Sequence, residues 1–216
     1  MKIAKQMKIA LYGSTGNIGK RILHEALQRG HSVTAIVRDI SKLTPAQNLT
    51  IVEGDIMNSR DVSEKVKGHD VVISAYGPGF TEVHKLNDAT KALIAGVKHS
   101  GVKRLIAVGG AATLEVAPGV ELLDSGHLPE EWKPIANAHK EALKEYTNEK
   151  ELDWSYLHPA AFIEPGERTG KFRTGGRQLL TDKEGNSKIS MEDYAIALID
   201  EAENAAHIQQ RFSVAY

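Results

Sequence analysis

Residues 8 to 23 read Lys8-Ile9-Ala10-Leu11-Tyr12-Gly13-Ser14-Thr15-Gly16-Asn17-Ile18-Gly19-Lys20-Arg21-Ile22-Leu23. The pattern predicts a short apolar strand, a turn with glycines three residues apart, and a helix with one apolar face. Gly13 permits a sharp turn because glycine reaches positive φ without penalty, and Gly19 lets the helix lie close to the strand. Gly16 leaves room for a pyrophosphate, which the N–H groups of the first helical turn would bind. A second strand is expected at Val33 to Val37, and this context indicates a dinucleotide site, whereas a lone glycine pattern could be a turn that binds nothing.

The composition is typical of one domain with one hydrophobic core, since 41% of the 216 residues are hydrophobic. A formal net charge of −1 gives no sign of a nucleic-acid or membrane partner. The absence of cysteine excludes disulfides and thiolate catalysis, and the nine histidines lack the spacing of metal ligands, so we expect no metal. Residues 1–7 are expected to be a loose leader that is too short and too charged for a signal peptide. We therefore expect a cytoplasmic protein, either a monomer or a small homo-oligomer.

Apolar strand patterns alternate with helical patterns along the rest of the chain. Strands are expected at residues 50–55, 70–75, 103–108, 153–158 and 211–215. Helices are expected to begin after the caps Asn58 or Ser59, Thr81 and Ser190, and at Ile135. The alternation predicts a single-domain Rossmann-type α/β fold over residues 8–216, a doubly wound parallel sheet with helices on both faces. Two irregular segments, 111–134 and 159–189, are expected to be substrate-side loops, and the first is a candidate lid.

Ligands bind at the carboxyl ends of the strands in such sheets, so these ends locate the predicted cofactor site. Arg38 ends the second strand, where an arginine suits the 2′-phosphate of NADP, and this favours NADP(H) over NAD(H). Asp39 beside it could instead bind a ribose. Asp55 could accept from an adenine amino group or could cap a turn. The predicted cofactor-binding residues are Gly13, Ser14, Thr15, Gly16, Asn17, Ile18, Gly19, Arg38, Asp55, Ile56, Ala75, Tyr76, Gly77, Gly109, Gly110, Pro159, Ala160, Ala161 and Phe162.

The glycine turn, together with Gly54-Asp55, resembles the atypical short-chain dehydrogenase/reductases of the NmrA-like NAD(P)-binding family. More specific segments resemble the bacterial proteins grouped as NADH-flavin reductases, which are relatives of flavin/biliverdin reductase B. The resemblance runs from about residue 8 to the end of the chain. It implies an NAD(P)H-binding Rossmann domain and hydride transfer to a flavin, FMN or FAD. The segments that carry it are residues 74–79, 108–111, 114–119, 159–170 and 211–216.

Typical short-chain dehydrogenases use a serine and a Tyr-x-x-x-Lys pair, and this chain departs from that pattern. Tyr146 and Lys150 have the spacing, but Tyr146 is expected roughly 16 Å down its helix, at 1.5 Å per residue. Ala136 stands where the tyrosine belongs, and small residues at 110–112 stand where the serine belongs. The missing acid–base machinery disfavours an epimerase or a steroid-type dehydrogenase. It fits direct hydride transfer to a flavin or another planar acceptor, and equally a non-catalytic NADP-binding redox sensor of the NmrA type.

Several other residues are candidates for a catalytic or acceptor-binding role, and each of them could instead have a purely structural role. Tyr76, His139 and Lys140 are weak candidates for proton donation, and His158 at the end of a strand is another. For the histidines and the lysine, a surface or packing role is the alternative. Four aromatic residues could form a platform for a planar acceptor, or could simply anchor their loops. These four are Tyr76, Phe80, Trp132 and Phe162.

Overall fold

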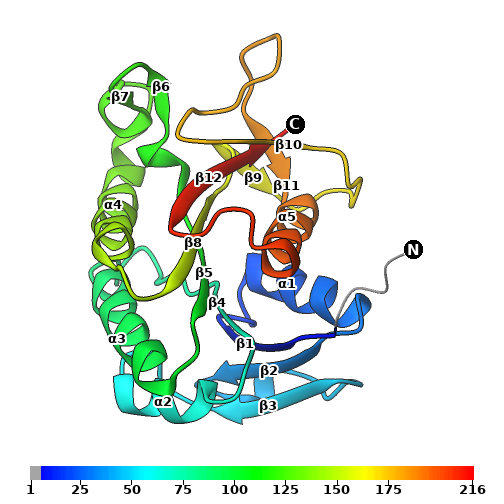
Figure 1. Ribbon diagram of the computed structural model, residues 1–216. Helices are drawn as coiled ribbons and strands as arrows, with labels where there is room; N and C mark the ends of the chain where they lie inside the picture. The colour runs from blue at the N-terminus through cyan, green and yellow to red at the C-terminus, as the bar shows by residue number, and fades with distance from the viewer. Residues whose placement is uncertain (1–5) are drawn as a thin grey trace.

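An eight-stranded sheet in the order β10-β12-β8-β5-β4-β1-β2-β3 runs through the computed structural model, which describes residues 6–216 (Figure 1). Neighbouring strands are parallel except at one edge, where β10 pairs antiparallel with β12. The strands of this sheet are β1 (Lys8–Tyr12), β2 (Ser32–Val37), β3 (Leu49–Glu53), β4 (Val71–Ser74), β5 (Arg104–Val108), β8 (Asp153–His158), β10 (Arg173–Gly175) and β12 (Gln210–Ala215). The predicted doubly wound Rossmann-type fold is confirmed, with the antiparallel edge strand as an addition.

Helices cover both faces of the sheet (Figure 1). They are α1 (Asn17–Gln28), α2 (Ser59–Val66), α3 (Lys85–Ser100), α4 (Lys133–Asn148) and α5 (Met191–Asn204). β1 shows why two layers form, because its side chains alternate between two apolar cores. Ile9 and Leu11 pack in the core that includes residues of α1 and α5, whereas Ala10 and Tyr12 pack in the core that includes residues of α2, α3 and α4. None of the helices within residues 6–216 is long and apolar enough to span a membrane.

Two helix starts differ from the predictions. α3 begins at Lys85, with His84 as its N-cap, rather than after a cap at Thr81, because residues 79–85 form separate turns, with Glu82 N–H bonded to the Gly79 carbonyl. α4 begins at Lys133, two residues before the predicted start at Ile135, with Pro134 in its first turn. A proline at that position loses no helical hydrogen bond, since the first N–H groups of a helix have no partner in it.

The two predicted substrate-side segments contain short regular elements and join each other. Within 111–134 lie β6 (Glu115–Ala117), β7 (Val120–Glu121) and three 3-10 turns. Within 159–189 lie β9 (Phe162–Glu164), β10 and most of β11 (Lys188–Ser190). Glu115 is the junction: its N–H donates to the Arg177 carbonyl at 2.8 Å, and its carbonyl accepts from Leu179 N–H at 2.9 Å.

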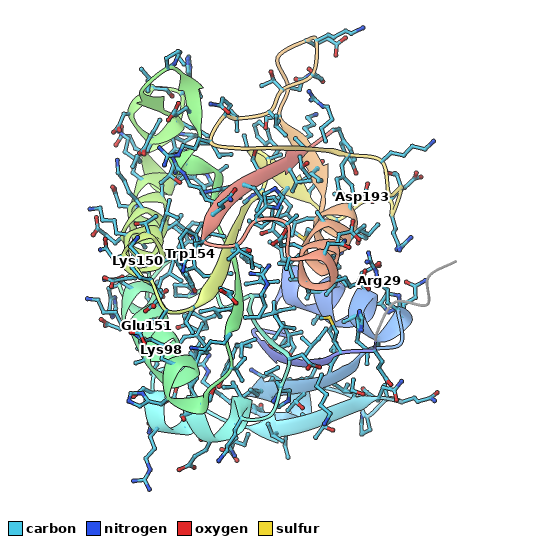
Figure 2. The ribbon with its side chains drawn as sticks, in the orientation of Figure 1. Arg29, Lys98, Lys150, Glu151, Trp154 and Asp193 are labelled. Atoms are coloured by element: carbon cyan, nitrogen blue, oxygen red, sulfur yellow. The ribbon has the colours of Figure 1, made fainter. Side chains whose placement is uncertain are left out.

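Charged side chains fasten α1 to α5 and to the segment before β10 (Figure 2). Arg29 on α1 donates to Asp200 at 2.7 Å and to Glu203 at 2.9 Å on α5. Asp193, near the start of α5, is fully buried and accepts from the N–H groups of Thr169 and Gly170, each at 2.8 Å. Between β9 and β10, Thr169 and Gly170 are therefore held by a buried carboxylate, while Phe172 packs against the apolar core.

Most of the leader predicted over residues 1–7 falls outside the described residues. Met7, at its end, is joined to the domain: its carbonyl accepts from Ser32 N–H at 2.9 Å, and its N–H donates to His31 Nδ1 at 3.2 Å. At Met7 the chain is therefore already hydrogen-bonded to the start of β2, beside which β1 runs.

Candidate functional site

The glycine turn between β1 and α1 is packed so closely that side chains have no room in it. Gly13 has φ +78°, and a Cβ there would lie 2.3 Å from the Ala75 carbonyl oxygen. A Cβ on Gly19 would lie 2.0 Å from the Gly13 carbonyl oxygen. Gly16 is the N-cap of α1, and among residues 6–216 no side chain caps this helix start. The N–H groups of the first turn are thus open to an anionic ligand, which the helix dipole also favours.

A cleft of about 170 Å³ opens above this turn. It brings together eight of the predicted cofactor residues from the ends of β1, β2, β3 and β4: Gly13, Thr15, Gly16, Arg38, Ile56, Ala75, Tyr76 and Gly77. The other lining residues are Tyr12, Ile36, Val37, Asp39, Lys42 and Gly54. The cleft therefore combines a floor made of backbone, an apolar wall and a cationic end.

Four predicted residues of the turn are not on the lining of the cleft: Ser14, Asn17, Ile18 and the closely packed Gly19. Asn17 is exposed and Ile18 is half-buried, both in the first turn of α1. Ser14 is fully buried, and its hydroxyl has no hydrogen-bond partner within residues 6–216. Since a buried hydroxyl without a partner is unfavourable, Ser14 is an orphan polar group directly beside the proposed phosphate position.

Asp39 and Lys42 both line the charged end of the cleft, but Asp39 is already hydrogen-bonded within the protein. Asp39 Oδ1 accepts from the N–H and the hydroxyl of Ser41 at 3.0 and 2.6 Å, and these hydrogen bonds lower the pKa of the carboxyl. Asp39 thus caps the 3-10 turn Ile40–Lys42. Lys42 in that turn lines the cleft with Arg38, and both are exposed. We had not predicted Lys42; the signal for it is a second cation four residues after Arg38.

Asp55 caps a turn, which is the second of the two roles that the sequence predicted for it. Its Oδ1 accepts from Met57 N–H at 2.9 Å, and its own N–H donates to Asp61 Oδ2 at 2.7 Å. It lines a neighbouring polar pocket that shares Arg38 and Gly54 with the cleft, rather than the cleft itself. The adenine contact that the sequence suggested is thus not favoured by this geometry.

The small residues after β5 and β8 have a packing role. A Cβ on Gly109 would lie 2.2 Å from the Tyr156 ring, and one on Gly110 would lie 3.0 Å from the His139 ring. Both glycines make room for side chains from inside the domain. Ala160 is buried, like Pro159 before it, and Ala161 N–H donates to Ser187 Oγ at 3.1 Å, while Phe162 is exposed at the start of β9. These residues follow β5, which is adjacent to β4, and β8, which is one strand further along the sheet, and they are not among the residues that line the cleft.

The weak candidates for proton donation have other partners. Tyr76 lines the cleft half-buried, and burial raises the pKa of its phenol. His139 Nδ1 lies 3.1 Å from the Tyr156 hydroxyl, and burial lowers the pKa of His139 to about 4. Lys140 pairs with Glu121 at 2.7 Å, a hydrogen bond that raises its pKa, and so ties α4 to β7. His139 is therefore neutral at pH 7 and Lys140 is engaged in a structural contact.

His158 and Tyr146 are buried inside the domain. His158 Nδ1 donates to the Gly110 carbonyl at 2.7 Å, and burial lowers the pKa of the ring to about 3. Tyr146 is 2% exposed, and its ring centroid lies 5.4 Å from that of Tyr156. Lys150 Nζ donates to the Thr147 carbonyl at 2.7 Å. Tyr146 thus lies in the core beneath α4, and Lys150 lies just beyond the end of that helix. Both lie far from the first turn of α4, as the sequence predicted.

The fold and the cleft define a Rossmann-type nucleotide-binding protein. The chain belongs to the NAD(P)H-binding family, whose model matches residues 13–205. A crystal structure described as a putative exported protein from Burkholderia pseudomallei is 47% identical and covers 98% of this chain and 100% of its own, with a TM-score of 0.91. A putative epimerase from Bacteroides thetaiotaomicron is 43% identical, with 98% of each chain covered and a TM-score of 0.91. A putative NADH-flavin reductase from Streptococcus pneumoniae is 32% identical, covering 97% and 99%, with a TM-score of 0.87. These three names differ from one another, whereas the fold is shared.

Proposed function

We propose that the protein is a reductase that uses NADP(H) and passes hydride to a flavin or another planar acceptor. The observation that carries the proposal is the cleft, in which the uncapped start of α1 meets Arg38 and Lys42 at the end of β2. The first feature suits a diphosphate and the second suits an additional phosphate on the adenosine ribose. Asp39, the residue that could favour NAD(H), is already engaged by Ser41. NADP(H) would be held by Gly13, Gly16, the first turn of α1, Arg38 and Lys42.

The surroundings of His139 and Lys140 support an acceptor that needs no proton-donating side chain of the protein. When bound, the dinucleotide would supply hydride, and the acceptor ring would take it up together with a proton from water. His139 is neutral and Lys140 is paired with Glu121, so neither is a free acid at pH 7. The protein's contribution would be to orient two planar rings and to exclude competing reactions.

Calorimetry with NADPH and NADH, followed by absorbance at 340 nm with FMN, FAD and quinones, tests this proposal. We expect NADPH to bind at least tenfold more tightly than NADH, and turnover well above the uncatalysed rate with at least one acceptor. If neither dinucleotide binds, the proposal is wrong.

A non-catalytic redox sensor is the second candidate function, because the same paired state of His139 and Lys140 also fits a protein without chemistry. It predicts tight NADPH binding, turnover no faster than the uncatalysed rate with every acceptor, and recovery of a protein partner by pulldown. The cytoplasmic location and the monomeric or small oligomeric state stay predictions.

A further inference from the structure

Two large aromatic side chains contact each other at the surface. The rings of Phe80 and Trp132 lie edge to face, with centroids 5.1 Å apart and an interplanar angle of 78°. Phe80 is 61% exposed and Trp132 is 46% exposed. Other large aromatic residues of the domain, such as Tyr156 and Phe212, are 2% exposed. Phe162 is also exposed, but only Phe80 and Trp132 are exposed aromatic residues in ring contact with each other among residues 6–216. Such a pair leaves contiguous apolar area in water, which indicates that a ligand covers it.

The position of the pair follows from the elements that carry it. Phe80 lies on the loop that follows β4, three residues after Gly77. Gly77 itself lines the cleft. Trp132 ends the 3-10 turn directly before α4, and His139 of α4 contacts Gly110 after β5. β4 and β5 are neighbours in the sheet. A dinucleotide with its adenosine at Arg38 and its diphosphate over Gly13 would extend across the ends of β4 and β5, toward the loops that carry this pair.

The charges around the pair indicate the chemistry of its ligand. Lys85 pairs with Glu82, and Lys133 pairs with Glu130, so cations on both sides are neutralised locally. The part of the ligand that contacts the two rings would therefore be uncharged, as the ring system of a flavin is, and a phosphate on the same ligand would lie away from these two ion pairs. An edge-to-face pair leaves ring faces free for a further stacked ring.

We propose that Phe80 and Trp132 form the platform on which the planar ring system of the acceptor rests. The platform selects multi-ring acceptors over single-ring ones, because only an extended ring system reaches from the nicotinamide to both side chains. This inference rests on the proposed reductase function. Tyr76 belongs to the cleft and Phe162 to the start of β9, so the platform has two of the four aromatic residues that the sequence suggested.

Fluorescence tests the platform by binding alone. The chain has two tryptophans, and Trp154 is 3% exposed with its indole N–H bonded to the Glu149 carbonyl (Figure 2). Trp132→Phe therefore leaves only a buried reporter, and the difference between wild type and this variant isolates Trp132. With NADP⁺ present, saturating FMN should quench at least half of the Trp132 emission and protect it from iodide, with less than a tenth of that change at Trp154. Full iodide access to Trp132 at saturating FMN would overturn the proposal.

Steady-state kinetics test the role of planarity. The double variant Phe80→Leu, Trp132→Leu keeps apolar bulk but removes flat rings, and should raise the KM for FMN at least tenfold while the KM for 1,4-benzoquinone changes less than twofold. Trp132→Phe is the matched control that keeps a flat ring, and should stay within twofold of wild type for both acceptors. Equal changes for both acceptors in the double variant would overturn the platform.

The two arms separate this inference from the proposed function. If wild type turns over no acceptor, the reductase function fails, and protection of Trp132 by FMN still decides whether the platform binds a planar ring. If Trp132 is covered only when a protein partner is added, the pair is a protein contact and the platform is wrong.

Discussion

The β1–β2 half and the β5–β8–β12 half of the sheet build their ligand-facing ends in different ways. In the first half, a continuous run from Tyr12 to Gly19 forms a floor of backbone atoms. In the second half, side chains from distant parts of the chain hold the loop after β5: His158 donates to the Gly110 carbonyl at 2.7 Å, and Arg211 donates to the Thr113 carbonyl at 3.1 Å. A site made of backbone needs only local spacing, whereas a site held by side chains needs the whole fold.

The largest effect should come from Gly13→Ala. The new Cβ would meet the Ala75 carbonyl at 2.3 Å in a left-handed conformation, so we expect dinucleotide affinity to fall at least about 100-fold and unfolding free energy to fall by about 3 kcal/mol. Gly30→Ala is the matched control, because Gly30 has φ +83° but nothing within 4 Å of its Cβ position. It should lose about 1 kcal/mol and no affinity. Calorimetry and urea unfolding measure both; equal losses in the two variants would show that the turn is not a close-packed floor.

Arg38→Ala should lower NADPH affinity about 30-fold, or about 2 kcal/mol, since a charge-assisted hydrogen bond to a phosphate is lost. NADH affinity should change less than threefold, because NADH lacks that phosphate. Arg60→Ala, on α2 with a side chain that is 90% exposed, serves as the control and should change neither. Isothermal titration with both dinucleotides makes the comparison. A parallel loss for NADPH and NADH would remove the argument for NADP(H).

Acid should destabilise the second half through buried histidines. The unfolded chain protonates histidine near pH 6.5, but folded His158 does so only near pH 3, so the unfolded state binds more protons and stability falls as the pH is lowered from 7 toward 3. Between pH 7 and pH 5, His158 should account for about 2 kcal/mol of this fall. His158→Asn keeps a donor for the Gly110 carbonyl and should remove that share of the slope in urea unfolding. His99→Asn, exposed on α3, should leave the slope as in wild type; the hypothesis fails if both variants behave alike.

Lys140→Met should have the smallest effect. It removes the contacts of α4 with Glu121 and Asp124, so the segment 111–134 loosens and the acceptor KM should rise about threefold, while dinucleotide affinity is unchanged. Unfolding free energy should fall by less than about 1 kcal/mol, as for other partly exposed ion pairs. Lys144→Met, one turn further along α4, loses only the exposed pair with Glu141 and should behave as wild type. A weakened NADPH affinity in Lys140→Met would contradict the division between the halves.

Local patterns were sufficient for the elements of the first half and for most of the sheet. β1, β8 and the N-cap of α5 were predicted at their observed residues, because apolar runs and the Ser190 cap act over a few positions. β10 was missed, since Arg173–Gly175 is a short, largely exposed segment whose pairing depends only on β12. The N-cap of α3 was predicted at Thr81, three residues before the observed His84, because separate turns occupy the residues after Thr81.

The sequence by itself determined the Rossmann-type fold and the glycine turn, since both depend on spacing within about twenty residues. The contacts of Asp39 with Ser41 and of Asp55 with Met57 are local, each spanning two residues. Only the tertiary structure decided the partners that are distant in the chain. It joined His158 to the Gly110 carbonyl, Lys140 to Glu121, and Phe80 to Trp132 across 52 residues of chain. The physical reason is that a polar or aromatic group takes the best partner within reach, and that partner is set by the packing of elements far apart in the chain.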